Sequence, residues 1–531
     1  MADSFAGTGA LVRLALRRDR LLLTLWILGF AGMAGFSAAA TVGLYPDEGS
    51  RVQAAEIVNA TGALVALYGP VYDPTSVGAL SLFKLTAFGA AITAVLFVFV
   101  VIRHTRAEEE AGRLELLGAG RLGRLAALSA ALIVAFGASL VLGVASAGSL
   151  IAAGLPVAGS FAFGLGWAFT GIAFASLAGV TAQVTTGARA GRSLALIAVA
   201  VAYALRAVGD VASGGGNWLS WLSPIGWMQQ VRAYAGDRWW VLLLPTAMAA
   251  VCVPVAMVLR SRRDLGAGLL TDRAGPSQGK LSSVSGLAWR LQRTVLISWA
   301  VGFAAFGFLL GSISDSVTGF LDSPQAAEYL QKLGGTDALA DAFLAAELAI
   351  MGVLVAAYGI EAASRLHGEE EDGHAEVLLA TSVSRGRWAA SHLVIALLGV
   401  AGVLFVGGLA VGLGAWVATG DAGQVGALAV AALSKVPAAW VLTGLLFLLF
   451  GWLPRAVPVI WGVFAVAVVV GEFGPLWDAP QWVMNLSPFV HSPGLPAPNA
   501  SLVGLVPLTL TAVVLLGLGF VGWRRRDLTT P

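Results

Sequence analysis

Two acidic segments carry the residues of this chain that could do chemistry or bind a charged partner. Residues 108–124 read EEEAGRLELLGAGRLGR, and residues 369–385 read EEEDGHAEVLLATSVSR. Eight of the seventeen aligned positions are identical at a constant offset of 261, and they include three consecutive glutamates and a fourth glutamate. Carboxylates in such a cluster could bind a metal ion or pair with cationic groups of another protein.

The metal alternative rests on the second copy, in which His367, Glu369, Asp372 and His374 cluster. The first copy has arginines at the positions of both histidines, and arginine is not a metal ligand. The chain also contains no HExxH sequence, which is the commonest signature of a zinc hydrolase. We therefore expect no metal site.

A single run of glutamates would ordinarily do no more than solvate a loop. Its retention in two otherwise divergent copies instead favours a docking surface for a partner with twofold symmetry, and a helix beginning at the glutamates would favour the anions through its dipole. The predicted docking residues are Glu108, Glu109, Glu110, Gly112, Glu115, Glu369, Glu370, Glu371, Gly373 and Glu376.

The amino-acid composition indicates that the elements holding these acidic segments lie in a lipid bilayer. Of the 531 residues, 58% are hydrophobic and 12% are charged, and the mean hydropathy is +0.83. This balance predicts a membrane protein, and apolar runs of about 20 residues predict spanning helices rather than barrel strands. The predicted spans are 21–44, 85–102, 125–153, 160–186, 193–209, 239–259, 295–313, 342–364, 388–416, 425–453, 456–475 and 502–523.

The distribution of basic residues predicts the orientation. The two ends of the chain and the segments after spans two, four, six, eight and ten hold 25 of the 32 lysines and arginines. By the positive-inside rule these segments, including both termini and both acidic segments, are cytoplasmic. Arginines number 28 and lysines 4, which is typical of a bacterial genome rich in G and C. We expect a multi-pass protein of the bacterial plasma membrane.

Further matches in the same order indicate two tandem halves. Trp26 aligns with Trp299, residues 222–224 (LSP) with 486–488, and residues 262–265 (RRDL) with 525–528. The predicted organisation is an all-α pseudo-dimer: a six-span half at 1–264, a linker at 265–285 rich in Gly and Ser, and a second six-span half at 286–531. An even number of spans in each half makes the two repeats parallel.

These features resemble the ABC-2 type permeases. The glutamate-rich segment after the second span, six spans per half, and the LSP sequence before the sixth span are shared with that family. The tandem form with RRDL after each half is similar to bacterial permeases that export polyketide antibiotics and other drugs. The resemblance covers nearly the whole chain, and its most specific parts are the acidic segments and the RRDL sequences.

The resemblance implies a type V exporter fold in which a separate ATPase, in two copies, supplies the energy. It implies interfacial helices at 11–20 and 286–293, and coupling helices at 106–119 and 367–380, which would contact the ATPase. Residues 274–281 (AGPSQGKL) lack the first Gly and the final Ser or Thr of a phosphate-binding loop. We therefore expect no catalytic residue and no cofactor on this chain, with ATP and Mg²⁺ bound by the partner, and we expect no nucleic-acid partner.

The expected substrate is a small hydrophobic or amphiphilic compound moving between the halves. Candidates for its path are Phe97, Phe99, Tyr203, Glu347, Tyr358, Trp461 and Phe464. Glu347 lies deep in span eight, where a charge requires a partner or a function, and it is the candidate for binding a substrate cation. The alternatives are an ion-coupled secondary transporter, for which Glu347 is the one well-placed acid, and an ATP-driven exporter of lipid.

Overall fold

The computed structural model describes residues 2–528 except 61, 119–121, 214–215, 265, 270–278, 280–282, 320–335, 474–479 and 497–499. The described residues form helices and no strands. Twelve of these helical segments are long and apolar enough to cross a membrane. This confirms the predicted all-α, twelve-span class. The chain divides into two compact units, Met1–Gly275 and Pro276–Pro531, which are described separately below.

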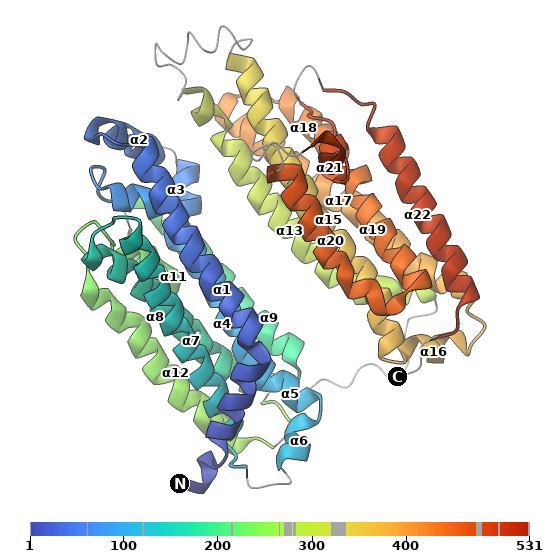
Figure 1. The fold of residues 1–531 in the computed structure, drawn as a ribbon, viewed down its shortest axis with the longest axis horizontal. Helices are drawn as coiled ribbons and strands as arrows, with labels where there is room; N and C mark the ends of the chain where they lie inside the picture. Colours follow the sequence, from blue (N-terminus) through green and yellow to red (C-terminus); the bar gives the residue numbers. More distant parts are fainter. Residues whose placement is uncertain are drawn as a thin grey trace. The chain divides into compact units, whose positions relative to one another are not determined.

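The first unit contains six spanning helices that run alongside one another (Figure 1). They are α1 (Thr8–Leu44), α4 (Val77–His104), α7 (Ala126–Ala152), α8 (Val157–Val184), α9 (Ala188–Ser213) and α12 (Leu243–Arg262). The short helices α2 (Glu48–Ala60) and α3 (Gly62–Tyr68) follow α1, and α10 (Trp218–Leu222) and α11 (Pro224–Gln230) follow α9. Helices α5 (Arg106–Glu110) and α6 (Arg113–Gly118) connect α4 to α7 at the opposite end.

The second unit has α13 (Val284–Gly319), α15 (Thr336–Glu371), α17 (Arg385–Thr419), α18 (Gly423–Leu433), α19 (Val436–Trp452), α20 (Ile460–Val468) and α22 (Leu505–Arg525). Helices α18 and α19 together form span ten and are separated at Ser434 and Lys435. The short helices are α16 (His374–Leu379) and α21 (Gln481–Met484). The acidic segment of this unit is the end of α15 together with α16.

Helix α8 lies at the centre of the first unit and packs against α4, α7, α9 and α12. Its crossing with α7 is close because both helices have a glycine there. A β-carbon on Gly143 would lie 2.4 Å from the carbonyl oxygen of Gly164, and one on Gly164 would lie 2.2 Å from that of Gly143. Small residues at such crossings allow backbones to approach within van der Waals contact in a membrane.

The helices differ in detail from those expected. The expected interfacial helices at 11–20 and 286–293 are the first turns of α1 and α13, which continue without a break into spans one and seven. Each expected coupling helix is instead two helical pieces separated by a turn. Most of the expected linker at 265–285 lies outside the described residues.

Candidate functional site

The acidic segments turn at equivalent glycines. Gly112 separates α5 from α6 with φ of 69°, and Gly373 separates α15 from α16 with φ of 75°. Residues with a β-carbon rarely adopt this left-handed conformation, which explains a glycine at the same position of both segments. In each segment the three glutamates therefore precede the turn and the fourth follows it.

The middle glutamate of the first segment is buried among arginines. The Glu109 side chain is 4% exposed. Arg263 donates two hydrogen bonds to it, from Nη1 at 2.9 Å and from Nη2 at 2.7 Å, and Arg106 donates a third at 2.6 Å. Arg260 lies 3.9 Å away. A buried carboxylate requires such partners, and the paired hydrogen bonds from Arg263 fix its position relative to the end of α12.

The middle glutamate of the second segment has the same kind of partner. Arg526 donates hydrogen bonds to Glu370 at 2.6 Å and 2.5 Å, and the Glu370 side chain is 2% exposed. The Arg526 guanidinium also stacks over Phe450 and Trp523, with its carbon 4.9 Å and 4.7 Å from the ring centres. The second arginine of each RRDL sequence therefore binds the second glutamate of the acidic segment in the same half.

One further arginine completes the junction in each half. Arg124, after the first acidic segment, donates a hydrogen bond of 2.7 Å to the carbonyl oxygen of Arg263. Arg385, after the second, donates one of 2.6 Å to the carbonyl oxygen of Arg526. Each acidic segment is thus bound at both of its ends to the chain that follows the sixth span of its half. We call these two arrangements the glutamate–arginine junctions. They consist of Glu109, Arg263 and Arg124 in the first half and of Glu370, Arg526 and Arg385 in the second.

Sequence analysis assigned Glu109 and Glu370 to the docking surface, and the structure places them inside the protein instead. The physical reason is that arginines of the same half satisfy their charge. The acidic segments and the RRDL sequences were recognised as separate repeats. The glutamates of the first and the arginines of the second have opposite charges, which was the signal that these repeats bind one another.

The first glutamate of the first segment binds the start of α1. Glu108 forms an ion pair with Arg18 and a hydrogen bond of 2.6 Å with Arg113. The next residue of α1, the fully buried Asp19, lies 2.5 Å from the imidazole of His104. Sequence analysis did not single out Asp19, and its signal was a lone acid within a basic terminal segment. These contacts hold α1 against the end of α4.

In the second segment the flanking glutamates pair with local groups. Glu369 is 7% exposed and binds Arg365 at 2.6 Å and His374 at 3.3 Å. Glu371 is 64% exposed and lies 3.2 Å from His367. Within the described residues no three His, Cys, Asp or Glu side chains are arranged to hold a metal ion.

Four glutamates of the acidic segments present exposed side chains. Glu110 is exposed, although one oxygen accepts a hydrogen bond of 3.1 Å from the Ala188 backbone N–H at the start of α9. Glu115, Glu371 and Glu376 are also exposed. These four carboxylates, at equivalent positions of the two segments, are the part of the predicted docking surface that a partner could touch. We call them the exposed glutamates.

Two of the substrate-path candidates fill the cores of their own halves. Phe97 is fully buried, and a β-carbon on Gly171 would lie 2.7 Å from its ring. Tyr358, at the equivalent position, is fully buried with its ring centre 6.0 Å from that of Trp299. Neither side chain lines an open path in this structure.

The other candidates of the first half differ in environment. Phe99 is 39% exposed, and the guanidinium of Arg192 lies 4.7 Å from its ring centre. Tyr203 donates a hydrogen bond to the carbonyl oxygen of Leu67 in α3, and Arg206 lies 4.5 Å from its ring centre. Tyr203 is therefore held by structural contacts, while Phe99 presents an accessible face.

In the second half, Trp461 is 45% exposed on α20 and packs against Phe464, with ring centres 6.1 Å apart. Glu347 is half-buried on α15 and has no hydrogen bond or ion pair with any described residue. Its role, and those of the other path candidates, remain predictions.

Three other charged residues in the spans have structural partners. Arg206 and Asp210 are fully buried 3.4 Å apart on α9, and Arg206 also donates a hydrogen bond of 2.6 Å to the Ala66 carbonyl oxygen. Lys435, at the break in span ten, donates to the carbonyl oxygen of Pro493. Backbone carbonyls and a salt bridge thus account for these residues, as expected for charges inside a membrane protein.

Twelve apolar helices, with buried charges such as Glu109, Glu370 and Arg206 paired inside their own halves, define a multi-pass membrane protein. Comparison with known proteins is more specific. Residues 281–524 match the family model described as the C-terminal domain of multidrug efflux system permease Rv1217c. The chain is 42% identical over 534 residues to the multidrug efflux system permease protein Rv1217c of Mycobacterium tuberculosis (strain ATCC 25618 / H37Rv), covering 99% of this chain and 96% of the relative. The chain belongs to this family of efflux permeases, which is consistent with the ABC-2 type.

Proposed function

We propose that this chain is the membrane-spanning subunit of an ATP-driven exporter, and that it moves a hydrophobic or amphiphilic compound such as a drug or antibiotic out of the cell. The relative's name, multidrug efflux permease, supports the class of cargo. A separate ATPase, in two copies, provides the energy. Each copy binds one acidic segment at the cytoplasmic face.

The observation that carries this proposal is the pair of glutamate–arginine junctions. Each junction fixes an acidic segment to the residues that follow the sixth span, through hydrogen bonds of 2.9 Å or less. A force applied to the segment is therefore transmitted to the end of that span as well as to spans two and three. Reversing a 1:99 population of two conformations takes about 5.5 kcal/mol of differential binding, and a loosely tethered loop could not deliver this to the spans.

The exposed glutamates are the contact surface, and the buried Glu109 and Glu370 are positioning residues. This division follows from burial: a partner can pair with Glu110 or Glu371, whereas Glu109 and Glu370 already have arginine partners. Basic groups on the ATPase would complement the exposed carboxylates. Their electrostatic attraction contributes to the rate and register of docking.

The test is charge reversal of the exposed glutamates in the full-length protein. Lysine at all four positions should abolish co-purification of the ATPase and drug-stimulated ATP hydrolysis while leaving the permease folded. The matched control reverses Glu48 and Glu56, which lie on α2 at the opposite end of the first half. Undiminished binding and hydrolysis in the fourfold variant would show that energy does not enter through the acidic segments.

A further inference from the structure

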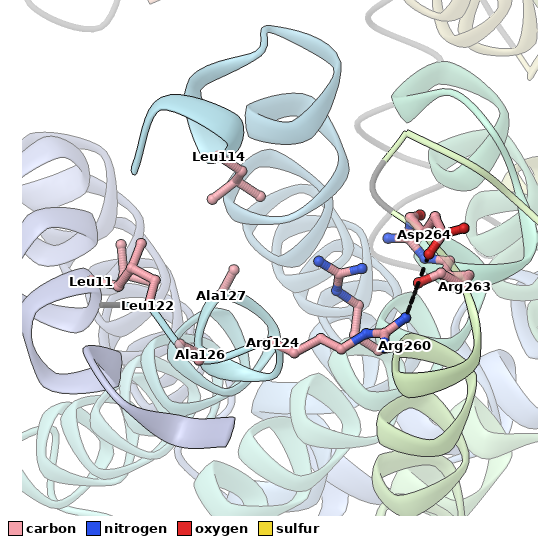
Figure 2. Close-up of a pocket in the computed structure, with 10 residues that line it drawn as sticks. Leu11, Leu114, Leu122, Arg124, Ala126, Ala127, Arg260, Arg263 and Asp264 are labelled. Atoms are coloured by element: carbon pink, nitrogen blue, oxygen red, sulfur yellow. Dashed lines mark hydrogen bonds and ion pairs between the residues drawn. The ribbon is translucent and has the colours of Figure 1, made fainter. Parts of the chain in front are cut away.

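A pocket of about 310 Å³ lies beside the glutamate–arginine junction of the first half (Figure 2). One wall is apolar and comes from α1, α6, the start of α7 and the residue Leu122. The other wall carries Arg124, Arg260 and Arg263, and Figure 2 shows Arg124 extending from the side of the leucines toward Arg263. The apolar side includes Leu11, Leu114, Leu122 and Ala127.

The arginines at this pocket are only partly neutralised. Arg260 is 7% exposed, and it donates no side-chain hydrogen bond to any described residue. Among the described residues, its one ion pair is the 3.9 Å approach to Glu109, whose oxygens already accept from Arg263 and Arg106. Asp264, whose side chain is 99% exposed, pairs with Arg124 at 3.9 Å, and because solvent screens this pair it offsets the arginine's charge only weakly. A guanidinium has five donors, and Arg260 lines the pocket with donors that no described residue accepts, so the pocket is a favourable place for an anion.

The equivalent place in the second half is filled with aromatic side chains. At the offset of 261, Ala127 aligns with Trp388, and at the RRDL offset of 263, Arg260 aligns with Trp523. Both tryptophans are fully buried, with ring centres 5.3 Å apart. The first half therefore has a methyl group and a guanidinium where the second has two packed indoles. The pocket results from this pair of differences and is not a general feature of the junction.

The position of the pocket indicates what kind of anion it holds. It lies where α1 begins and α12 ends, at the basic end of the half and therefore at the depth of lipid headgroups. An apolar wall next to three arginines suits a molecule that has a phosphate and a hydrocarbon chain. Basic pockets between membrane helices commonly bind anionic lipid headgroups in this way.

We propose that this pocket binds the phosphate of an anionic amphiphile, with a phospholipid of the same leaflet as its source. Arg260 and Arg124 donate to the phosphate, and the leucine wall contacts the first part of an acyl chain. Because Arg263 joins this wall to Glu109, an occupant would sit directly on the junction and contribute to its rigidity.

The test measures lipid retention by the full-length protein in nanodiscs of phosphatidylcholine doped with phosphatidylglycerol, by native mass spectrometry. Arg260→Gln should weaken retention of phosphatidylglycerol by about tenfold, the effect of losing one charged hydrogen bond. Arg262→Gln, which removes an adjacent exposed arginine outside the pocket, should retain it as the unaltered protein does. Equal retention by the Arg260 and Arg262 variants would overturn the proposal.

A second variant separates binding from folding. Ala127→Trp combined with Arg260→Trp copies the packing of the second half, so it should fold with an unchanged melting temperature and retain no excess of phosphatidylglycerol. Inorganic phosphate added at millimolar concentration distinguishes a phospholipid from a soluble phosphate as the source of the bound anion. Displacement of the lipid by phosphate alone would support the anion site but assign it to a soluble phosphate, whereas displacement by the ATPase subunit would overturn the proposal and assign the pocket to the protein interface.

Discussion

The buried glutamates of the two junctions and the exposed glutamates beside them make opposite contributions. Glu109 is surrounded by three arginines of its own half, and removing its charge leaves guanidinium groups buried without a counterion. Glu110, the next residue, is exposed. Neighbours in the sequence are therefore expected to behave as a structural and a surface residue, and the same holds for Glu370 and Glu371.

We predict that Glu109→Gln destabilises the protein by about 3–5 kcal/mol, as observed when one member of a buried ion pair is removed. Glu110→Gln should cost about 0–1 kcal/mol, in the range of exposed ion pairs. Melting temperatures of the purified protein in detergent would measure the difference. Equal effects of the two substitutions would contradict the buried assignment, and Glu370→Gln against Glu371→Gln repeats the test in the other half.

Glu347 has no partner among the described residues, which distinguishes it from Arg206, Asp210 and Lys435. A carboxylate in a span is costly unless it binds a cation, and a transported cation could serve. We predict that Glu347→Gln reduces efflux of cationic compounds by roughly tenfold, corresponding to loss of one charged interaction, and leaves neutral compounds unaffected. Glu361→Gln, an exposed position on the same helix, is the matched control. An equal loss for both classes of compound would argue against substrate contact.

At the scale of the element, the turn between the two helical pieces of each acidic segment depends on glycine. Gly112 and Gly373 have positive φ, and a β-carbon at either position would meet no atom within 4 Å. The cost of substitution is therefore conformational and not steric. Alanine should destabilise each turn by about 1–2 kcal/mol, whereas asparagine, which tolerates this conformation, should cost less.

The measurement is drug-stimulated ATP hydrolysis by the reconstituted exporter together with its melting temperature. Gly112→Ala should lower both, and Gly112→Asn should restore most of the loss. Gly137→Ala, in the interior of α7 with ordinary φ and no atom near its β-carbon, controls for the added methyl group. Loss in the Gly137 variant equal to that in the Gly112 variant would show that the turn conformation is not the cause.

Elements were easier to predict than contacts. The twelve spans follow from apolar runs, because lipid permits no other regular structure for them. The continuity of α1 through Arg17 and Arg20 was not predicted, since charged residues on one face of a helix end look the same in sequence as a separate interfacial helix. The burial of Glu109 and Glu370 was also missed. A sequence shows two repeated motifs of opposite charge, but only the fold brings residues 154 positions apart into one junction.

At the scale of the molecule, the orientation in the membrane decides which end of each half a cytoplasmic partner can reach. Each half buries its junction at one end, and the exposed acids Glu48 and Glu56 lie at the other end of the first half. If the positive-inside rule holds, the junctions and both termini are cytoplasmic. The proposed ATPase requires the same orientation, because ATP is available only on that side.

Cysteine labelling would establish this orientation, and the sequence is well suited to it because Cys252 is its single cysteine. In a Cys252→Ser background, Asp372→Cys lies in the exposed turn before α16, and Glu56→Cys lies on the exposed face of α2. A membrane-impermeant maleimide added to intact cells should label position 56 and should label position 372 only after permeabilisation. The opposite pattern would place both acidic segments outside the cell, where no ATPase could reach them, and would leave Glu347 and an ion gradient as the source of energy for transport.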